Sequence, residues 1–371
     1  MRNELERIEV PGEHEARERT WGVLEAAFRE RRPVERRRAM WRPAVAIALV
    51  VTAGAAVLSS PGRAVLDDLR EVVGVERAQP ALFSLPSEGR LLVASDAGVW
   101  VVQRDGSKRL LGPYREASWS PFGRFVVAAS ANELAALEPD GAVRWTLERP
   151  NVRSPRWGGT ETNTRIAYVD RTGLRVVAGD GTGDRLLVRG ASGPIAWLPG
   201  AGFVLAYADR RGRIVMLDTE SNRVLARSRA GARPKELVWS DDGRRLLAIG
   251  PFSVRSLDAR GRFHGDEGPS DGTVVVTDAI RPKTRQVFEI RRAGAGSNVF
   301  RWSGGRSVFR GAGELRDLAW SPDGRWLLIT WPTADQWVFV RADGERIRAV
   351  SNVSEQFRSR TFPRVEGWCC P

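Results

Sequence analysis

Histidine and cysteine, which bind zinc and often act in catalysis, are scarce in this chain of 371 residues. It has two histidines, His14 and His264, and two cysteines, which stand side by side as Cys369 and Cys370. A zinc site of the usual kind is built largely from histidine and cysteine ligands, and the chain offers no such set. We therefore expect no metal, no cofactor and no catalytic residues, and we predict that the protein is not an enzyme.

Lysine is nearly absent as well. Only Lys108, Lys235 and Lys283 are found among 58 basic residues, so the formal net charge of +13 rests on arginine. The arginines are scattered through the predicted strands and turns, and no nucleic-acid-binding motif accompanies them. We interpret the arginine excess as the mark of a GC-rich bacterial genome, and we predict that the protein does not bind nucleic acid.

A tryptophan, in contrast, returns at a nearly constant spacing. Three copies share one turn, at residues 119–124 (WSPFGR), 239–244 (WSDDGR) and 320–325 (WSPDGR). Trp157 and Trp197 continue the period, Ile280 stands where the sixth tryptophan is expected, and Trp368 lies near the C-terminus. The step is roughly 40 residues, and a fixed period of that size is typical of propellers and other repeat architectures.

Each repeat unit contains several short β-rich runs. An apolar run such as 125–128 (FVVA) follows the tryptophan turn, and later runs meet at Asp-Gly turns such as Asp343-Gly344. Asp-Gly between β-rich runs is typical of a hairpin, because both residues tolerate positive φ. Four short strands per unit, without helical periodicity, predict the blades of an all-β propeller.

The number of blades follows from the two ends of the repeat region. Residues 80–371 would provide about 42 residues per blade for seven blades, close to the usual length of roughly 40–45. The strand around 364–368 has no blade after it, and the apolar runs 90–94 and 98–102 have no tryptophan strand before them. We therefore predict a seven-bladed β-propeller closed by its C-terminal strand. The alternative is a six-bladed ring in which 250–315 forms one enlarged blade.

These repeats resemble the TolB-like, WD-repeat-like propellers of bacteria, whose repeat carries a Trp-Ser-Pro-Asp-Gly turn. Residues 320–324 match that turn in full, and the copies at 119 and 239 differ from it at one position each. The resemblance covers nearly all of 80–371 and implies a propeller that binds proteins or peptides. The tryptophans themselves are expected to pack between neighbouring sheets, since large aromatic side chains bury much apolar area.

Residues 44–60 (AVAIALVVTAGAAVLSS) carry no charge, and seven arginines stand between positions 29 and 42 just before them. Such a run is at the lower end of what spans a bilayer. The positive-inside rule then places the N-terminus in the cytoplasm. We predict a single-pass plasma-membrane protein with a basic cytoplasmic segment (1–42), a transmembrane helix (43–60), a juxtamembrane linker (61–79) and an extracytoplasmic propeller (80–371).

The cytoplasmic segment is predicted to contain an amphipathic helix over 12–32. Trp21, Leu24 and Phe28 form one apolar stripe among charged neighbours. Two interpretations stay open. The helix would either lie on the inner leaflet of the membrane or dock a cytoplasmic partner.

Charged residues recur just before the tryptophan that marks each repeat, or before Ile280, which replaces it in one copy. Four residues before it stand Arg115, Arg153, Gly193, Lys235, Val276, Arg316 and Arg364, and the next position holds Glu116, Glu236 and Asp317. This strand is usually the innermost one of a propeller blade, so these side chains are expected near one mouth of the central channel. We predict that the charged members form an anion-attracting ring that binds an acidic peptide or ligand. The alternative is that strand ends carry charges simply because they are solvated.

The two adjacent cysteines are expected to be oxidised outside the cell. A bridge between neighbours is strained, because their Cα atoms lie closer together than in ordinary disulfides. Two interpretations stay open. The cysteines form such a bridge, which would lock the closing strand after Trp368, or they form two intermolecular bridges.

Together these patterns predict a membrane-anchored, extracytoplasmic β-propeller that acts as a protein- or ligand-binding scaffold at the bacterial cell envelope. Its partner is a protein or peptide of unknown identity. One alternative is a transmembrane sensor that signals through the 12–32 helix. A second is an enzyme that uses carboxylates of the central channel. Fold alone does not decide among them, because propellers host many functions.

Overall fold

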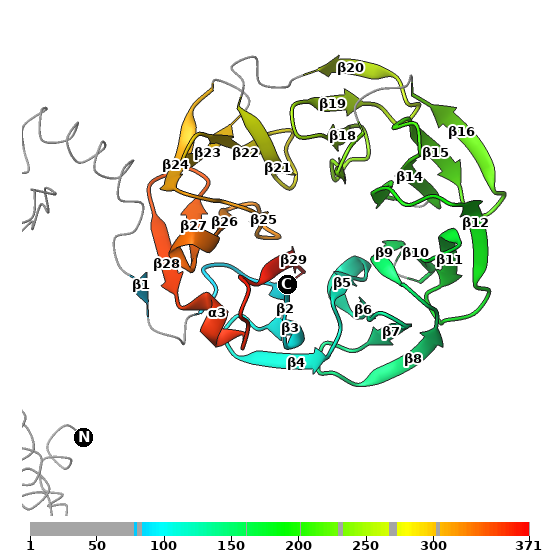
Figure 1. Cartoon of the computed structure of the whole chain (residues 1–371), viewed down its shortest axis with the longest axis horizontal. Coiled ribbons are helices and arrows are strands. Elements are labelled where there is room, and N and C mark those ends of the chain that lie inside the picture. The colour runs from blue at the N-terminus through cyan, green and yellow to red at the C-terminus, as the bar shows by residue number, and fades with distance from the viewer. Residues whose placement is uncertain are drawn as a thin grey trace, which may run out of the picture. The chain divides into compact units, whose positions relative to one another are not determined.

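Seven small sheets are arranged radially around a common centre (Figure 1). The computed structural model describes residues 78–79, 84–160, 162–200, 202–228, 233–266, 273–301 and 305–370. Six sheets have four strands and the seventh has five. The described residues therefore form an all-β, seven-bladed propeller, as predicted. The six-bladed alternative is wrong, because β21 to β24 (Val274–Ala312 overall) form a complete blade of their own.

The blades are numbered along the chain, starting from the ring closure, and strands are given from the centre outwards. Blade 1 consists of β29 (Arg364–Cys369), β2 (Arg90–Ser95), β3 (Gly98–Val102) and β4 (Lys108–Gly112). Blade 2 consists of β5 (Glu116–Trp119), β6 (Val126–Ala129), β7 (Glu133–Leu137) and β8 (Val143–Glu148). Blade 3 consists of β9 (Arg153–Gly159), β10 (Thr164–Val169), β11 (Gly173–Ala178) and β12 (Arg185–Arg189). Blade 4 consists of β13 (Ile195–Trp197), β14 (Val204–Ala208), β15 (Ile214–Asp218) and β16 (Arg223–Arg227).

The remaining blades follow the same order. Blade 5 consists of β17 (Glu236–Trp239), β18 (Leu246–Ile249), β19 (Val254–Leu257) and β20 (Phe263–Asp266). Blade 6 consists of β21 (Val274–Ile280), β22 (Val287–Ala293), β23 (Gly296–Arg301) and β24 (Ser307–Ala312). Blade 7 consists of β25 (Leu318–Trp320), β26 (Trp326–Trp331), β27 (Gln336–Arg341), β28 (Ile347–Ser351) and β1 (Ala78–Gln79). Three single-turn helices lie in the connections: η2 (Pro121–Gly123), η3 (Pro332–Ala334) and α3 (Val353–Gln356).

The two ends of the described chain close the ring. The last strand, β29, pairs antiparallel with β2, and Trp368 lies opposite Leu91 in this pairing. This confirms the predicted closure by the C-terminal strand. A further contact was not predicted: β1 pairs in parallel with β28 and becomes the outermost strand of blade 7.

The recurring turn after the tryptophan is held by its own side chains. In the copy at 320–325, Ser321 Oγ donates to Asp323 Oδ1 at 2.6 Å and accepts from the backbone N–H of Trp326 at 2.9 Å. Gly324 follows at φ 67°, which a glycine adopts without strain. Ser240 and Asp242 make the same bond at 2.6 Å. The serine and the aspartate of the turn therefore have local hydrogen-bonding roles, and the glycine has a conformational one.

The tryptophans that open the blades pack between neighbouring sheets, as expected. Trp119, Trp157, Trp239, Trp320 and Trp368 are each 6–8% exposed. The Trp320 ring meets Phe288 of the preceding blade edge-on, with ring centroids 4.8 Å apart. Trp197 covers Gly158 of blade 3 so closely that a Cβ there would lie 2.3 Å from its Cγ. The repeat residue is thus the main inter-blade packing element of this fold.

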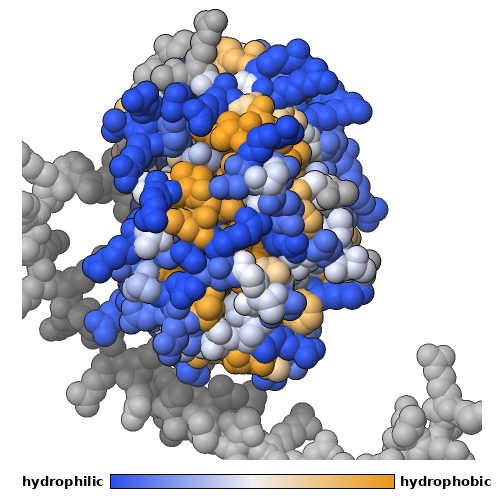
Figure 2. Space-filling view, turned by 90° about the vertical axis from the view of Figure 1, so that its right-hand side faces the viewer, coloured by the Kyte–Doolittle hydropathy of each residue, from blue (hydrophilic) through white to orange (hydrophobic). Residues whose placement is uncertain are grey.

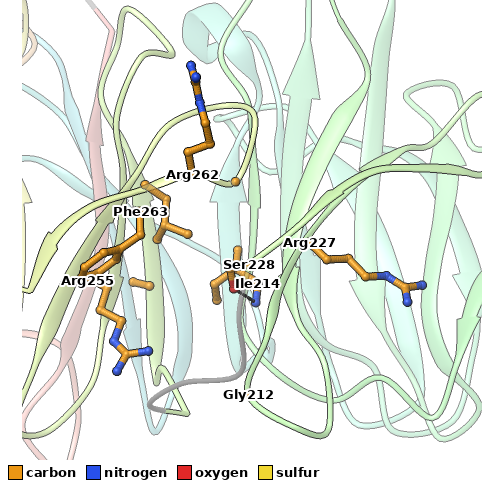
Figure 3. Close-up of a pocket in the computed structure, with 10 residues that line it drawn as sticks. Gly212, Ile214, Arg227, Ser228, Arg255, Arg262 and Phe263 are labelled. Atoms are coloured by element: carbon orange, nitrogen blue, oxygen red, sulfur yellow. Dashed lines mark hydrogen bonds between the residues drawn. The ribbon is translucent and has the colours of Figure 1, made fainter.

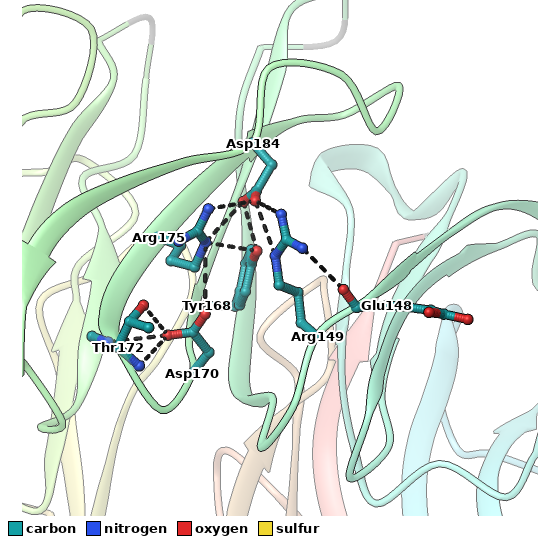
Figure 4. A network of polar contacts seen from close by, with 8 residues as sticks. Glu148, Arg149, Tyr168, Asp170, Thr172, Arg175 and Asp184 are labelled. Atoms are coloured by element: carbon teal, nitrogen blue, oxygen red, sulfur yellow. Dashed lines mark hydrogen bonds and ion pairs between the residues drawn. The ribbon is translucent and has the colours of Figure 1, made fainter.

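A buried polar network also ties two blades together (Figure 4). Asp184 of blade 3 accepts hydrogen bonds from Tyr168 Oη at 2.6 Å and from the Arg175 guanidinium at 2.6 Å. The Arg149 Nε of blade 2 reaches the same carboxylate at 3.1 Å. Burial alone would raise the pKa of Asp184, but these three donors outweigh it and hold the pKa below its usual range. The charge is stabilised because every partner is supplied inside the protein.

The predicted cytoplasmic segment, including the 12–32 helix, and the predicted membrane span at 43–60 lie outside the described residues. No helix within the described residues combines the length and the apolar character needed to cross a membrane.

Candidate functional site

The predicted charged residues lie where the inner strands begin. The inner strand of each blade, beginning with β29 in blade 1 and β5 in blade 2, faces the centre of the ring (Figure 1). Arg115 precedes β5, and Arg316 and Asp317 precede β25. The first residues of β9, β17 and β29 are Arg153, Glu236 and Arg364. All of these residues therefore stand at the same end of their strands, as the repeat alignment predicts.

Three of the arginines share one pocket. A cavity of about 540 Å³ is formed there, with Arg115, Arg316 and Arg364 in its wall. These residues come from blades 2, 7 and 1, which are consecutive around the ring. Tyr114, Phe362 and Thr361 complete much of the lining. We call this cavity the mouth pocket.

Two arginines of the mouth pocket, Arg316 and Arg364, make contacts with neighbouring residues. Arg364 donates to the carbonyl of Arg115 at 2.9 Å and pairs with Glu366 Oε1 at 3.0 Å. Arg316 donates to the carbonyl of Phe362 at 3.4 Å. Each guanidinium has five N–H donors, so these contacts leave capacity for an anion.

The loop on one side of the pocket is held by Asp96. Its carboxylate accepts from the backbone N–H groups of Arg360 and Thr361 at 2.7 and 3.0 Å. These hydrogen bonds lower the pKa of Asp96, the bond from the Thr361 backbone most of all. The acidic residue in the pocket lining is therefore bonded to the loop that contains Arg360 and Thr361.

The other two predicted basic residues do not line this pocket. Lys235 donates to the backbone carbonyls of Val275 and Val276, the first at 2.9 Å, and so joins blade 5 to blade 6. Burial lowers the pKa of Lys235. Arg153 stands on blade 3 and is exposed. The basic residues thus gather on one arc of the ring instead of around its whole circumference.

β-bulges in β9 and β29 make the predicted positions non-equivalent from blade to blade. In blade 2, Trp119 pairs with Val126, and Glu116 pairs with Ala129 three residues further on. In blade 1, Trp368 pairs with Leu91, and the residue three further on, Ala94, pairs with Arg364. Four steps along β29 thus match three steps along β2, because Glu366 has no partner in the ladder. Arg364 therefore stands at the register position that Glu116 occupies in blade 2. A bulge in β9 moves Arg153 in the same way. Bulges re-aim side chains in this manner because they insert one extra residue.

Carboxyl groups lie deeper than the arginines. Burial raises the pKa values of Glu236 and Asp317, although hydrogen bonds from Thr277 and from the Val365 backbone oppose the rise. Thr277 Oγ1 donates to Glu236 Oε2 at 2.8 Å. Glu116 accepts from the backbone N–H of Ser154 in the next blade. These three predicted acids therefore bond to neighbouring protein groups, and they do not line the mouth pocket.

Two residues of this region were not predicted. Glu366 is the extra residue of the β29 bulge, and burial raises its pKa to about 7. The pKa is raised further by Glu116 and Asp317 and lowered by Arg364 and Arg156, so these charges surround it. Arg156 also lowers the pKa of Glu236. Glu366 stands two residues before Trp368, and Arg156 stands one residue before Trp157. The sequence shows no recurring pattern at these two positions of the repeat.

The cysteines lie at the opposite end of β29. Cys369 and Cys370 are joined to each other by a disulfide bond. A Cβ on Gly123 of blade 2 would lie 2.9 Å from the Cβ of Cys370, so this contact requires glycine. The bridge therefore sits against the tryptophan turn of the next blade, beyond the closing strand.

Comparison with known proteins supports the fold alone. The chain is 14% identical to the β-propeller domain of Cps50 (Swd1) from Myceliophthora thermophila, with a TM-score of 0.51, over 73% of this chain and 97% of that one. It is also 14% identical to hydrazine synthase of Kuenenia stuttgartiensis, with a TM-score of 0.50, over 62% of this chain and 76% of that one. No family model and no curated protein sequence matches the chain. The TolB-like resemblance therefore stays a prediction, while the propeller fold is shared with these solved structures.

Proposed function

We propose that the protein is a membrane-anchored, extracytoplasmic scaffold whose mouth pocket binds an acidic segment of a protein or peptide partner. The observation that carries this proposal is the convergence of Arg115, Arg316 and Arg364 on one cavity of about 540 Å³. Arginine matches a carboxylate with two parallel hydrogen bonds, so a trio of arginines favours anionic groups.

The surroundings of Arg364 add a pH dependence to this binding. Glu366 pairs with Arg364 at 3.0 Å, and burial raises the pKa of Glu366 to about 7. Below that pH, Glu366 is neutral and leaves the positive charge of Arg364 available. Above it, the Glu366 carboxylate competes with an anionic ligand. Binding should therefore weaken as the pH rises from about 6 to 8.

The binding test uses fluorescence anisotropy with a labelled hexaglutamate peptide at low salt. The double variant Arg115→Ala with Arg316→Ala should weaken binding at least tenfold, since hydrogen bonds to charged groups contribute about 1.5–3 kcal/mol each. Arg153→Ala is the matched control, because Arg153 stands on the same type of strand but outside the pocket. Equal losses in both variants would mean that only general charge attraction is at work.

The pH dependence is tested with Glu366→Gln. In this variant the affinity for hexaglutamate should stay constant between pH 6 and 8, whereas the wild-type affinity should fall. An unchanged pH profile in the variant would remove Glu366 from the mechanism, while the arginine test above would still stand.

The anchor is supported by the uncharged run 44–60 and by the arginines before it. Cell fractionation should recover the full chain with the membrane, and protease added to intact spheroplasts should degrade the propeller. Crosslinked partners that persist after deletion of residues 1–40 would assign binding to the propeller. Partners lost with this deletion would instead favour signalling through the N-terminal segment.

A further inference from the structure

A second cavity lies on the outside of the ring, between the outer halves of blades 4 and 5. Its volume is about 470 Å³. Ile214 of β15 and Arg227 of β16 form one side, and Leu257 of β19 and Phe263 of β20 form the other (Figure 3). Small residues, among them Gly212, Ala248 and Gly261, leave the space open between the two sheets. We call this cavity the outer groove.

The outer groove is apolar at its centre and continues onto an exposed strand edge. Phe263 lies at the groove and is 55% exposed. On β16, which ends at the groove, Val224 and Leu225 are 36% and 44% exposed. Figure 2 looks at the side of the ring where β12 and β16 lie, and it shows apolar surface open between hydrophilic side chains. Exposed apolar side chains beside an apolar cavity are the surface that a contact with another molecule would bury.

The edge of β16 is also open for pairing. Within the described residues, β16 pairs with β15 on one side and with no strand on the other. An edge strand with exposed valine and leucine presents unpaired N–H and C=O groups to an incoming chain. An extended segment that adds to such an edge gains main-chain hydrogen bonds, and pockets beside the edge select its side chains.

Three arginines set the charge of the outer groove. The stems of Arg227, Arg255 and Arg262 line it, and their guanidinium groups point away from one another (Figure 3). Arg262 donates to Asp258 at 2.9 Å, yet its side chain remains 66% exposed. Because the three positive groups diverge, they cannot close around one compact anion. They suit several carboxylates spaced along a chain.

We propose that the outer groove binds an extended acidic segment of a partner protein. One apolar side chain of that segment occupies the groove beside Phe263, and its acidic neighbours meet the exposed guanidinium groups of Arg227 and Arg262. This site differs from the mouth pocket in chemistry, because the mouth pocket is mainly polar and offers no large apolar surface to an anchor residue. The two sites therefore serve different segments or different partners.

The test uses the full-length protein and a labelled peptide in which one phenylalanine is flanked on each side by three glutamates. Arg227→Glu and Phe263→Ala should each weaken binding of this peptide at least fivefold. Arg109→Glu is the control for charge, since Arg109 is an exposed residue on the outer strand β4 of blade 1. Phe252→Ala is the control for exposed aromatic surface, because Phe252 is 67% exposed on blade 5 outside the groove. Both controls should bind within twofold of the wild type.

Further peptides and variants separate the outcomes. Replacing the phenylalanine of the peptide by alanine should weaken binding about as much as Phe263→Ala, and a lysine-flanked peptide should not bind. The phenylalanine peptide also carries glutamates that the mouth pocket binds, so the same measurements are made in the background of the Arg115→Ala and Arg316→Ala double variant, where this peptide should still bind and hexaglutamate should not. If that double variant loses binding while Arg227→Glu keeps it, the peptide occupies the mouth pocket and the outer groove proposal is wrong.

Displacement of the peptide by dodecyl phosphate at equal concentration would assign the groove to an anionic lipid instead. No measurable binding to the wild type would overturn the proposal outright.

Discussion

The contact between blades 7 and 1 and the contact between blades 5 and 6 are built in opposite ways. The first is the ring closure, and its buried cluster contains seven aromatic side chains: Trp100, Trp326, Trp337, Phe339, Phe357, Phe362 and Trp368. The second has a small aliphatic cluster formed by Leu247, Ile249, Val254, Val275 and Val287. It also holds two buried carboxyl groups, Asp278 at 3% and Glu289 at 0% exposure.

The difference follows from chain connectivity. Blades 5 and 6 are joined by the chain itself, so their contact need not hold two distant ends together. Blades 7 and 1 are held through the β2–β29 pairing, whose strands are remote in sequence. Bringing such strands together costs chain entropy, which burial of large aromatic surface can offset. The closure therefore has the richest apolar packing, while the contact between blades 5 and 6 tolerates polar groups.

The largest effect is expected from Phe357→Ala at the closure. Phe357 is fully buried, with ring centroids 5.1 Å from Trp337 and 5.8 Å from Trp100. The substitution should lower the free energy of unfolding by about 3–5 kcal/mol. Leu247→Ala at the contact between blades 5 and 6 should cost less, about 2–3 kcal/mol. Urea unfolding of both variants provides the comparison. Equal losses would contradict the idea that the closure depends more strongly on its packing.

A second prediction compares two kinds of buried carboxyl group. Asp184 is charged and bonded to Arg149, Arg175 and Tyr168. Asp184→Asn removes the charge and leaves buried arginines without their partner, so it should cost about 3 kcal/mol at pH 7. The pKa of Asp184 is lowered, so this contribution is present at neutral pH and is lost as the pH falls through the folded-state pKa. The wild type and the variant should therefore converge in stability toward acid pH, as urea unfolding at several pH values would show.

Asp278→Asn should raise the free energy of unfolding, whereas Asp184→Asn should lower it. Asp278 lies opposite Glu289 on neighbouring strands, and burial, together with the charge of Glu289, raises its pKa. A raised pKa means that its stabilising contribution is present below the unfolded-state pKa and is lost as the pH rises through the folded-state pKa. Asparagine is always neutral and can donate to Glu289, so the variant should be more stable than the wild type at pH 8, by about 1 kcal/mol.

The control for this substitution is Asp140→Asn, in an exposed turn, which should be neutral. Urea midpoints measured from pH 4 to 8 should fall less in Asp278→Asn than in the wild type. A variant that is less stable at every pH would show that Asp278 is needed in its charged form.

The smallest effect is expected at the disulfide. A bridge between adjacent residues closes almost no loop of chain, so it restricts the unfolded state little. Changing Cys369 and Cys370 together to serine should alter the free energy of unfolding by less than about 1 kcal/mol. A loss comparable to that of Phe357→Ala would mean that the closure depends on the covalent bond as much as on its aromatic packing.

The repeat architecture was predictable from the sequence because its determinants are local. The serine and aspartate of the tryptophan turn bond within the turn, and the tryptophan spacing counts the blades directly. Even the position of Ile280 was predicted correctly, as it ends the inner strand of blade 6.

The mouth pocket was predictable only in part. Arg115, Arg316 and Arg364 do share a cavity, but Arg153 and Lys235 lie elsewhere. The bulges in β9 and β29 shift the register by one residue, and no spacing rule along one strand reveals a residue skipped in the ladder. The pairing of Asp278 with Glu289 depends on burial and on a neighbouring strand, which a repeat pattern does not report. The outer groove depends on small residues of two blades, which carry no pattern of their own.

The short strand β1 has a mechanical consequence. A pulling force on the chain before Ala78 reaches the propeller first through the two-residue pairing of β1 with β28. Only after this pairing opens is the force passed on to β2, which lies between β29 and β3. The first rupture would therefore free the chain up to β2 and leave the β2–β29 closure of the ring intact.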